Sequence, residues 1–574
     1  MHCRPTWFLS LISLVIAPCA TALLRAAEPI DLSGAQVWTR DGELTAAESA
    51  AVSILIDEVE KRTKIRWNHV KGEEPAGGPL IVLASRLEMG ARGLSVNNDN
   101  WPSSHSPEAF SVYRDGSGPT TRIYVLAHES RGVMYGVGYL LRHLEMMPNR
   151  VTVAHNVRAD MTPDKALRGH QIGYRPRANS WDAWTVDQFE QYFRDLIVFG
   201  ANAVENIPFQ DNDPGPLMKL PRDRMNVEFS KLCAKYDLQH WVWIPVEFAL
   251  ADEPDKADAF LTRQSAFYAE CPRLDGIFVP GGDPGSNPSS ALMPYLERMA
   301  DVCTEHHNEA KIWVSLQGFK QADIDDFYQY VEKNNPDWLG GVVMGPSSPP
   351  LNVTRERLPE RYGIRWYPDI THNVRCQYPI PWLDPVWGLT VGREGVNPRP
   401  RDFAAIYENE RRMTNGFITY SDGIHDDFNK NFWSALGLDP SISSREFAEQ
   451  YARYFFRGDV SVFGADALAG LEENLRGSAE SNGSVQGTLA LWQKMDEALP
   501  KGRNWRFDMH LFRAYCDAYT QRRLVFETNL EREAIRTLDS HSFESDMAMK
   551  LAETILARAD TEPVHPEMLQ RIES

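Results

Sequence analysis

Carboxyl side chains that could serve as acid and base follow several short apolar runs of the sequence. Asp283 stands in a turn rich in Gly and Pro, within FVPGGDPG. Asp369 comes after a second apolar run, in WYPDITHN, and Asp422 and Asp427 come after a third, in SDGIHDD. If these runs are strands of one sheet, their carboxyls converge. Hydrolysis of a glycosidic bond needs such a pair, because one carboxyl protonates the leaving oxygen while the other activates water or attacks the anomeric carbon.

Side chains suited to holding a sugar are expected beside these acids. The predicted sugar-binding residues are His170, Tyr174, Arg175, Glu247, Trp366, His372 and His425. Arg175 has the geometry to receive a uronic-acid carboxylate in bidentate fashion, and a surface Arg that neutralises nearby acids is the alternative. Asp427 directly precedes a predicted helix, so an N-cap role competes with catalysis there.

The acids need a scaffold that brings strand ends together, and residues 164–435 predict one. Short apolar runs alternate there with amphipathic segments, which is typical of parallel β/α units. The eight predicted strands are residues 167–174, 203–207, 240–245, 276–279, 311–316, 341–344, 364–367 and 416–420. Eight units favour a (β/α)8 TIM barrel, an α/β fold whose catalytic groups lie at the C-terminal ends of the strands. An open doubly wound sheet is less favoured, since no Gly-rich phosphate turn follows an early strand.

Two further domains are predicted around the barrel. Residues 28–163 read as a small α+β domain with an amphipathic helix over 45–63. Residues 436–574 are rich in Leu, Ala, Glu and Arg and predict an all-helical C-terminal domain. The last amphipathic segment has no clear stop signal, so a truncated C-terminus is one expectation and a fraying last helix is the other.

Residues 1–27 predict a secretory signal peptide. Arg4 precedes an apolar run that is too short to span a bilayer, and small residues follow this run. No later stretch qualifies as a membrane span, so no membrane insertion is expected and the mature protein should be secreted or periplasmic. The five Cys beyond the signal are scattered and odd in number. They predict core thiols rather than a disulfide framework or a zinc site.

Charge and composition restrict the partners. The formal net charge is −19 at pH 7 and the sequence has no run of Lys or Arg, so binding to nucleic acid is not expected. The 16 Trp and 20 Tyr exceed what packing usually needs, and flat aromatic rings suit the C–H faces of sugars. The expected partner is a carbohydrate substrate, no cofactor is required, and the oligomeric state is left open.

Several segments resemble the α-glucuronidase family of glycoside hydrolases, in the same order along the chain. The segment ESRGVMYGVGYLL at 129–141 is similar to a helix in the small domain that precedes the barrel in α-glucuronidases and β-hexosaminidases. The turn with Asp283 resembles the family's SEGxPGP segment, whose Glu is the general acid. YPDIT, with Asp369, stands where the family has TQEYT, whose Glu helps to activate water. The resemblance implies an inverting hydrolase with Asp283 as acid and Asp369 as base, helped by Asp422 or Asp427.

Two departures from the family pattern leave alternatives open. The acid is an Asp instead of a Glu, and Ser347 or Ser348 replaces a second water-activating Asp after strand six. A β-N-acetylhexosaminidase is one alternative, although such enzymes carry an acidic pair after strand four, where this chain has two Gly before Asp283. A non-catalytic carbohydrate-binding barrel is another, because an essential carboxylate would be missing.

A metal-dependent hydrolase is a further alternative. His425, Asp426, Asp427, His170 and His372 are residue types that a divalent ion accepts as ligands. Barrels that use metals usually show His-x-His after strand one, whereas Gln and Ile follow His170 in this chain. Hydrogen bonds to sugar hydroxyls are therefore the favoured role for these imidazoles.

Overall fold

The central part of the chain is a closed barrel. The computed structural model describes residues 28–89, 98–118, 120–174, 181–210, 215–499, 504–540 and 545–574. Eight parallel strands close on themselves in chain order, which confirms the predicted (β/α)8 fold. They are β10 (Leu167–Gln171), β11 (Ala203–Asn206), β12 (Gln239–Trp243), β13 (Gly276–Pro280), β14 (Lys311–Ser315), β15 (Leu339–Met344), β16 (Gly363–Trp366) and β17 (Gly416–Thr419). Each overlaps one predicted strand. The predicted signal peptide and Arg175 lie outside the described residues.

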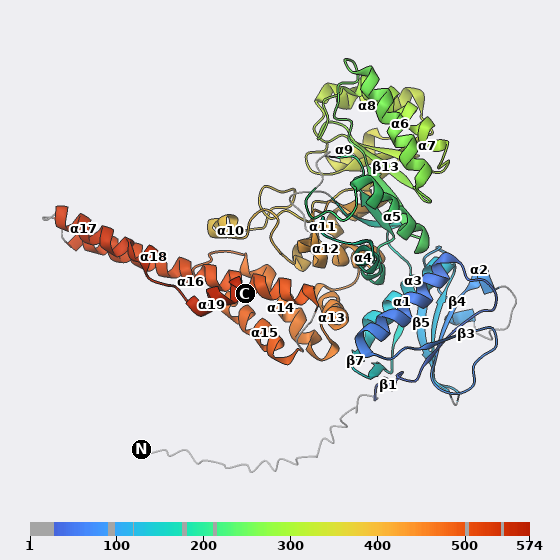
Figure 1. Ribbon diagram of the computed structural model, residues 1–574, viewed down its shortest axis with the longest axis horizontal. Coiled ribbons are helices and arrows are strands. Elements are labelled where there is room, and N and C mark those ends of the chain that lie inside the picture. Colours follow the sequence, from blue (N-terminus) through green and yellow to red (C-terminus); the bar gives the residue numbers. More distant parts are fainter. Residues whose placement is uncertain are drawn as a thin grey trace, which may run out of the picture.

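Helices follow the barrel strands around the outside of the barrel, and all but the last connect two successive strands (Figure 1). They are α4 (Val186–Val198), α5 (Arg222–Lys235), α6 (Pro254–Glu270), α7 (Ser289–Thr304), α8 (Gln321–Asn334), α9 (Leu351–Arg357), α11 (Pro400–Glu410) and α12 (Asp427–Leu438). The connection between β16 and α11 is much longer than a typical βα loop and contains the short helix α10 (Pro385–Thr390). This long connection supplies several side chains to the site described below.

Two tryptophans fill the lower half of the barrel, near the starts of the strands. Trp241 and Trp313 lie with their ring centroids 5.6 Å apart. Glycines opposite them make the space, because a Cβ on Gly276 would lie 2.5 Å from Cε3 of Trp241 and one on Gly363 would lie 2.6 Å from Cη2 of Trp313. The interior of a small barrel is a packed core, so any cavity must lie above these two rings.

The N-terminal region is α+β. Its six-stranded sheet has the order β3-β2-β4-β6-β5-β9, and a three-stranded sheet has the order β1-β8-β7. The strands are β1 (Ile30–Asp31), β2 (Gln36–Thr39), β3 (Asn68–Lys71), β4 (Leu80–Ser85), β5 (Phe110–Asp115), β6 (Arg122–Ala127), β7 (Leu144–Met147), β8 (Arg150–Val153) and β9 (Arg158–Met161). Helix α1 (Ala46–Thr63) begins at a capping box formed by Thr45 and Glu48, close to the predicted start.

Helix α3 (Ser130–His143) fastens this region to the barrel. A Cβ on Gly136 would lie 2.5 Å from Cγ1 of Val125 in β6, and one on Gly138 would lie 2.7 Å from the carbonyl oxygen of Val198 in α4. The small residues of this helix therefore allow close packing on the sheet. They also bring the helix against the barrel, which the sequence does not reveal.

The C-terminal region is helical. It contains α13 (Ser444–Phe455), α14 (Ser461–Asn474), α15 (Ser484–Ala498), α16 (Trp505–Ser540), α17 (Ser545–Leu556), α18 (Arg558–Thr561) and α19 (Pro566–Glu573). The long helix α16 and α17 project away from the barrel (Figure 1). At the other end of α16, Arg506 Nε donates to Asp427 Oδ2 at 2.7 Å, and Arg506 Nη1 lies 3.0 Å from Asp195 Oδ2. These buried ion pairs join the helices to the barrel.

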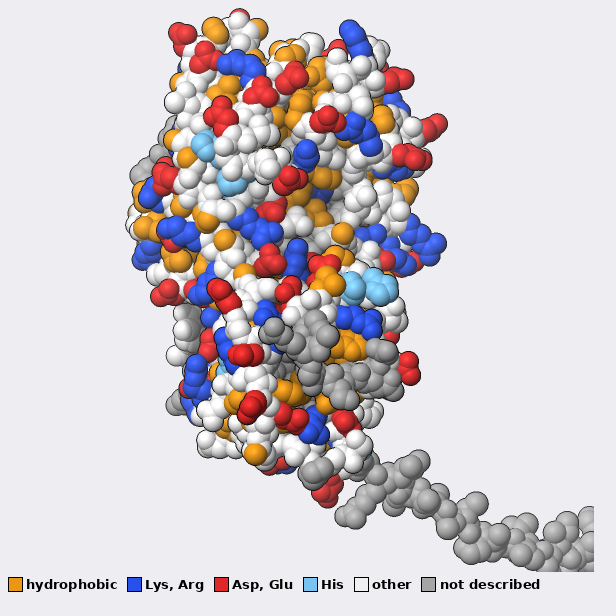
Figure 2. Space-filling view, turned by 90° about the vertical axis from the view of Figure 1, so that its right-hand side faces the viewer, with side chains coloured by type: hydrophobic (Ala, Val, Ile, Leu, Met, Phe, Trp, Pro, Cys, Tyr) orange, Lys and Arg blue, Asp and Glu red, His pale blue; other side chains and the backbone are white. Residues whose placement is uncertain are grey.

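The surface mixes charges of both signs. In Figure 2 the upper part of the molecule is the barrel and the lower part is the N-terminal region, and Lys and Arg side chains are interspersed with Asp and Glu on both. The described residues of this face thus present no broad basic area of the kind that binds a nucleic-acid backbone. Among the described helices, none combines the length and apolar character needed to cross a bilayer. The five Cys beyond residue 27 are free thiols.

The fit between Gly276 and Trp241 gives a stability prediction. Gly276→Ala should lower the free energy of unfolding by about 1–3 kcal/mol, since the added methyl overpacks the barrel floor. Urea denaturation measures this change. Gly388→Ala in α10 is the control, because a Cβ there meets nothing within 4 Å. Gly276→Ala combined with Trp241→Phe should recover part of the loss, and a fully stable Gly276→Ala single variant would contradict the packing described.

Candidate active site

A cavity of about 490 Å³ opens at the C-terminal ends of the barrel strands. This volume is in the range of small-ligand sites. Its aromatic side chains are Trp243, Phe278, Tyr367 and Tyr420. Its polar and charged side chains are Gln171, Gln210, Asp283, Gln317, Ser347, Asp369, His372, Arg375, Gln377 and Arg393. Aromatic rings beside amides and carboxyls suit a ligand that has both C–H faces and hydroxyl groups.

Asp283 is exposed on the rim of this cavity, in the turn after β13. The turn is tied to the loop after β14, because Gly281 N donates to Ser315 O and Gly282 N donates to Gln317 O, both at 3.0 Å. A Cβ on Gly282 would lie 2.5 Å from the carbonyl carbon of Gly318, so the two loops touch through their backbones. Gln317 Nε2 donates to Asp283 Oδ2 at 2.9 Å. The shaped turn expected from the sequence thus presents Asp283 to the cavity, beside an amide from the next strand.

Asp369 and His372 form a pair after the C-terminal end of β16, which is three strands further around the barrel than β13. Oδ1 of Asp369 accepts the backbone N–H groups of Thr371 and His372, both at 3.2 Å. Nδ1 of His372 lies 3.0 Å from Oδ2 of the same carboxyl. Both side chains are buried and both line the cavity. The contacts place a carboxyl group and an imidazole ring together where the sequence predicts the base.

Asp422 lies behind this pair and does not line the cavity. Tyr420, which does, donates its hydroxyl to Asp422 Oδ2 at 2.7 Å. The same oxygen lies 3.6 Å from Nε2 of His372. Strand six contributes Ser347 to the cavity and no carboxyl, so the predicted gap in the acid set is present in the structure.

Three predicted sugar-binding residues are placed elsewhere. His170 is fully buried on the outer side of β10, where its ring nitrogens contact Thr419 Oγ1 at 2.8 Å and Ser434 Oγ in α12 at 2.6 Å. Burial and the nearby Lys430 keep the pKa of His170 well below its ordinary value. The Tyr174 hydroxyl accepts the backbone N–H groups of 219 and 220 and donates to a carbonyl, which fixes the loop before α5. These residues hold the scaffold together and do not face the cavity.

Trp366 is likewise turned outward. Its ring centroid lies 4.7 Å from that of Trp433 in α12, and its Nε1 donates to the hydroxyl of Tyr378 at 3.2 Å. Its neighbour Tyr367 lines the cavity instead. Side chains alternate between the two faces of a strand, so the aromatic surface was predicted one residue too early.

Asp427 corrects a second expectation. It is fully buried and paired with Arg506, and Tyr451 donates its hydroxyl to Oδ2 at 2.7 Å. Burial raises the pKa of Asp427, but the charge and hydrogen bonds of Arg506 outweigh this effect, so the pKa lies below its ordinary value. No side-chain oxygen of Asp427 caps α12. Asp427 therefore joins the barrel to the helical region. It is neither an acid at the mouth nor the N-cap of α12.

The two remaining predicted residues in the described chain also lie off the cavity. His425 Nε2 contacts Thr371 Oγ1 at 2.5 Å, and burial lowers the pKa of its imidazole. His425 thus supports the loop that carries Asp369. Glu247 is exposed after β12 and is not among the residues that line the cavity.

A buried ion pair forms the floor between the cavity and the two tryptophans. Oε2 of Glu205 in β11 lies 2.5 Å from Nη1 of Arg365 in β16, and neither side chain is exposed. Gln171, which lines the cavity, donates to Glu205 Oε1 at 3.1 Å. The Arg365 guanidinium also lies 4.9 Å from the ring centroid of Phe278. Burial raises the pKa of Glu205, and the charge of Arg365 partly opposes this shift.

No feature of the sequence predicted several residues that line the cavity or form its floor. Arg375, Gln377 and Arg393 come from the long connection after β16, and Gln317 comes from the loop after β14. Gly363, Arg365 and Tyr367 occupy alternate positions along β16 and just after it. This alternation is the one signal that could have placed Arg365 inside the barrel.

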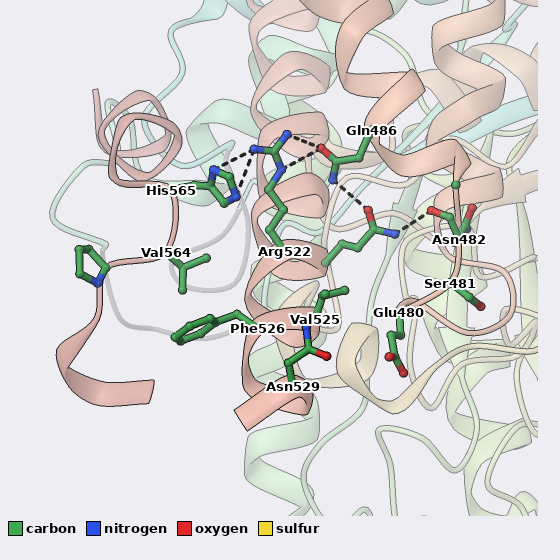
Figure 3. A pocket seen from close by; sticks show the side chains of 13 residues that line it. Glu480, Ser481, Asn482, Gln486, Arg522, Val525, Phe526, Asn529, Val564 and His565 are labelled. Carbon is green, nitrogen blue, oxygen red and sulfur yellow. Dashed lines mark hydrogen bonds between the residues drawn. The ribbon is translucent and has the colours of Figure 1, made fainter. Parts of the chain in front are cut away.

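A second hollow, of about 750 Å³, lies in the helical region between α15, α16 and the chain before α19. Its polar groups bond to one another (Figure 3): Arg522 donates to Gln486 Oε1 at 2.7 Å, and Gln486 donates to Gln521 Oε1 at 2.9 Å. Arg522 also contacts Nδ1 of His565 at 2.9 Å. Groups that already satisfy one another hold the C-terminal segment in place and leave little for a ligand. The barrel mouth is therefore the candidate active site.

Comparison with known proteins adds little to this geometry. No protein-family model matches the sequence, and no curated protein matches it significantly. A solved structure described as "Structure of CpGH84B" is similar with a TM-score of 0.48 and 12% identity, over 95% of this chain and 97% of that chain.

The floor of the cavity gives a pH-dependent prediction. Arg365→Met leaves Glu205 buried without its cation, which should raise its pKa further and cost about 3–5 kcal/mol at pH 8. A carboxyl with a raised pKa in the folded state destabilises the fold as pH rises through that pKa. The loss should therefore be smaller at pH 5 than at pH 8 in urea denaturation.

The matched control is Arg361→Met, which removes an exposed partner of Asp337 and should change little. Arg365→Met together with Glu205→Gln should remove the pH dependence. An Arg365→Met variant that is equally destabilised at both pH values would show that Glu205 does not depend on this arginine.

Proposed function

We propose that this protein is a secreted or periplasmic glycoside hydrolase that works at the mouth of its barrel. One observation carries the proposal. Two carboxyls from well-separated strands, Asp283 and Asp369, line one cavity together with four aromatic rings. Hydrolysis of a glycoside requires two carboxyls flanking the bond, and aromatic side chains provide the apolar surface that a sugar ring covers. The apolar leader at 1–27 supports export.

Within this proposal Asp283 is the general acid. It is the exposed carboxyl of the pair, on the rim where a leaving group departs. Asp369, held by two backbone N–H groups and His372, is the base that activates water. These contacts fix the orientation of the carboxyl, and a carboxylate has further lone pairs that can accept a proton from water. This assignment makes the reaction inverting.

Acidic sugars are the favoured substrates. Arg375 and Arg393 stand at the cavity, and both side chains are exposed. A guanidinium binds a carboxylate through two parallel hydrogen bonds, which suits a uronic acid and agrees with the resemblance to α-glucuronidases. Aryl uronides should therefore be cleaved better than the corresponding neutral aryl glycosides.

Asp283→Asn should lower kcat about 10²–10⁴-fold on the best substrate of an aryl-glycoside and uronide panel, because the leaving oxygen loses its proton donor. The loss should shrink as the leaving phenol becomes more acidic, since such a phenol departs without protonation. Sugar binding, measured by calorimetry, should persist. The control is Asp337→Asn, at the opposite end of the barrel. Equal losses for all leaving groups would exclude Asp283 as the acid.

Proton NMR of the first product formed gives the stereochemistry. An inverting reaction releases the anomer opposite to that of the substrate, because water attacks in a single displacement. Release of the same anomer would contradict the role given to Asp369 as base. It would leave glycoside hydrolysis standing, with a nucleophilic carboxyl in its place.

A non-catalytic carbohydrate-binding barrel is the second candidate function. Ser347 lines the cavity where the resembled family carries a water-activating Asp, so the acid set is one short. This candidate gains if the protein binds oligosaccharides and cleaves no member of a broad panel.

A further inference from the structure

The imidazole of His372 has one nitrogen turned away from Asp369. Its Nε2 is buried and has no hydrogen-bond partner, and the side chain is 3% exposed. Glu394 Oε1 lies 3.5 Å from this nitrogen and Asp422 Oδ2 lies 3.6 Å from it. One ligand atom of each of the three residues lies within 4.8 Å of the others. A buried, unsatisfied nitrogen costs free energy, and here it is directed between two carboxyls.

The spacing fits a shared cation better than direct hydrogen bonds. A hydrogen bond from Nε2 to either oxygen would be about 2.7–3.2 Å long. Ligands bound to Zn²⁺ at about 2.0–2.2 Å with tetrahedral angles lie about 3.4 Å apart. The two measured distances from Nε2 are close to this value. Glu394 is 27% exposed, and Arg393 Nη1 contacts its Oε1 at the long distance of 3.4 Å, so a small shift of this side chain would bring it closer to Asp422.

The surroundings of His372 are those of a metal-bound imidazole. Metal-binding histidines usually donate their second ring N–H to a carboxylate, which fixes the tautomer and the ring orientation. Asp369 stands 3.0 Å from Nδ1 in this role, and Tyr420 donates to Asp422 Oδ2 at 2.7 Å. One neutral imidazole and two carboxylates also balance the charge of a divalent ion.

We propose that His372 Nε2, Glu394 and Asp422 form a binding site for a divalent transition metal, with Zn²⁺ favoured by the nitrogen and oxygen donors. Three protein ligands leave a fourth position for water or another small oxygen ligand. The site lies beside the cavity, because His372 lines it and Glu394 follows Arg393, another lining residue. The site does not depend on hydrolysis at the cavity, since metal content is measured without a substrate.

The full-length protein is first stripped with a chelator and then titrated with ZnCl₂ by calorimetry, with bound metal counted by mass spectrometry after gel filtration. The wild-type protein should bind one equivalent. Glu394→Gln should weaken binding at least 10-fold, and Asp369→Asn should weaken it about 10–100-fold by loss of the outer-shell partner. Glu356→Gln, an exposed Glu on α9, is the control and should bind as the wild type does.

His372→Gln should abolish the site. If that variant does not fold, judged by circular dichroism, the partly exposed Glu394 keeps the test decisive. Failure of the wild type to retain zinc would overturn the proposal. Retention that is unchanged in Glu394→Gln and Asp369→Asn would also overturn it, because the metal would then be bound elsewhere on the chain.

Discussion

A closed eight-stranded barrel has an interior that side chains must fill, and the way this chain fills it determines where a ligand can bind. Trp241 and Trp313 occupy the lower half, where glycines on neighbouring strands admit their rings. The Glu205–Arg365 pair lies above them, among Phe278 and Tyr367. The cavity lies above this layer. The cavity is therefore bounded below by a buried ion pair between strands β11 and β16.

The same layering explains why the loops carry the chemistry. Strand interiors contribute aromatic rings and Gln171, whereas Asp283 and Asp369 stand just beyond the strand ends. Backbone contacts between the loops after β13 and β14 hold the first acid. His372 and two backbone N–H groups hold the second. A rigid barrel with acids on supported loops is the arrangement through which this fold takes on different chemistries.

The sequence predicted the barrel well, because strand positions follow from apolar runs and turn residues that are local. Asp283 and Asp369 lie on the cavity, as expected for residues that follow strands, and their catalytic roles stay predictions. The sequence was wrong where a shift of one residue changes the face of the strand on which a side chain lies. Trp366 and His170 were predicted to face the cavity, but their neighbours Tyr367 and Gln171 do so. It also could not reveal partners that are distant in the chain. The sequence predicts Asp427 to be an acid at the mouth or a helix cap, and it gives no sign of Arg506, which is 79 residues away and neutralises its charge.

A crystal structure of Asp283→Asn with a bound oligosaccharide tests the central claim most directly. The account predicts a sugar ring in the barrel-mouth cavity, packed on Tyr367 or Trp243, with the scissile oxygen at residue 283 and a water molecule on the Asp369 side. A sugar bound only in the hollow of the helical region, or a cavity that stays free of sugar at saturating concentration, would contradict it.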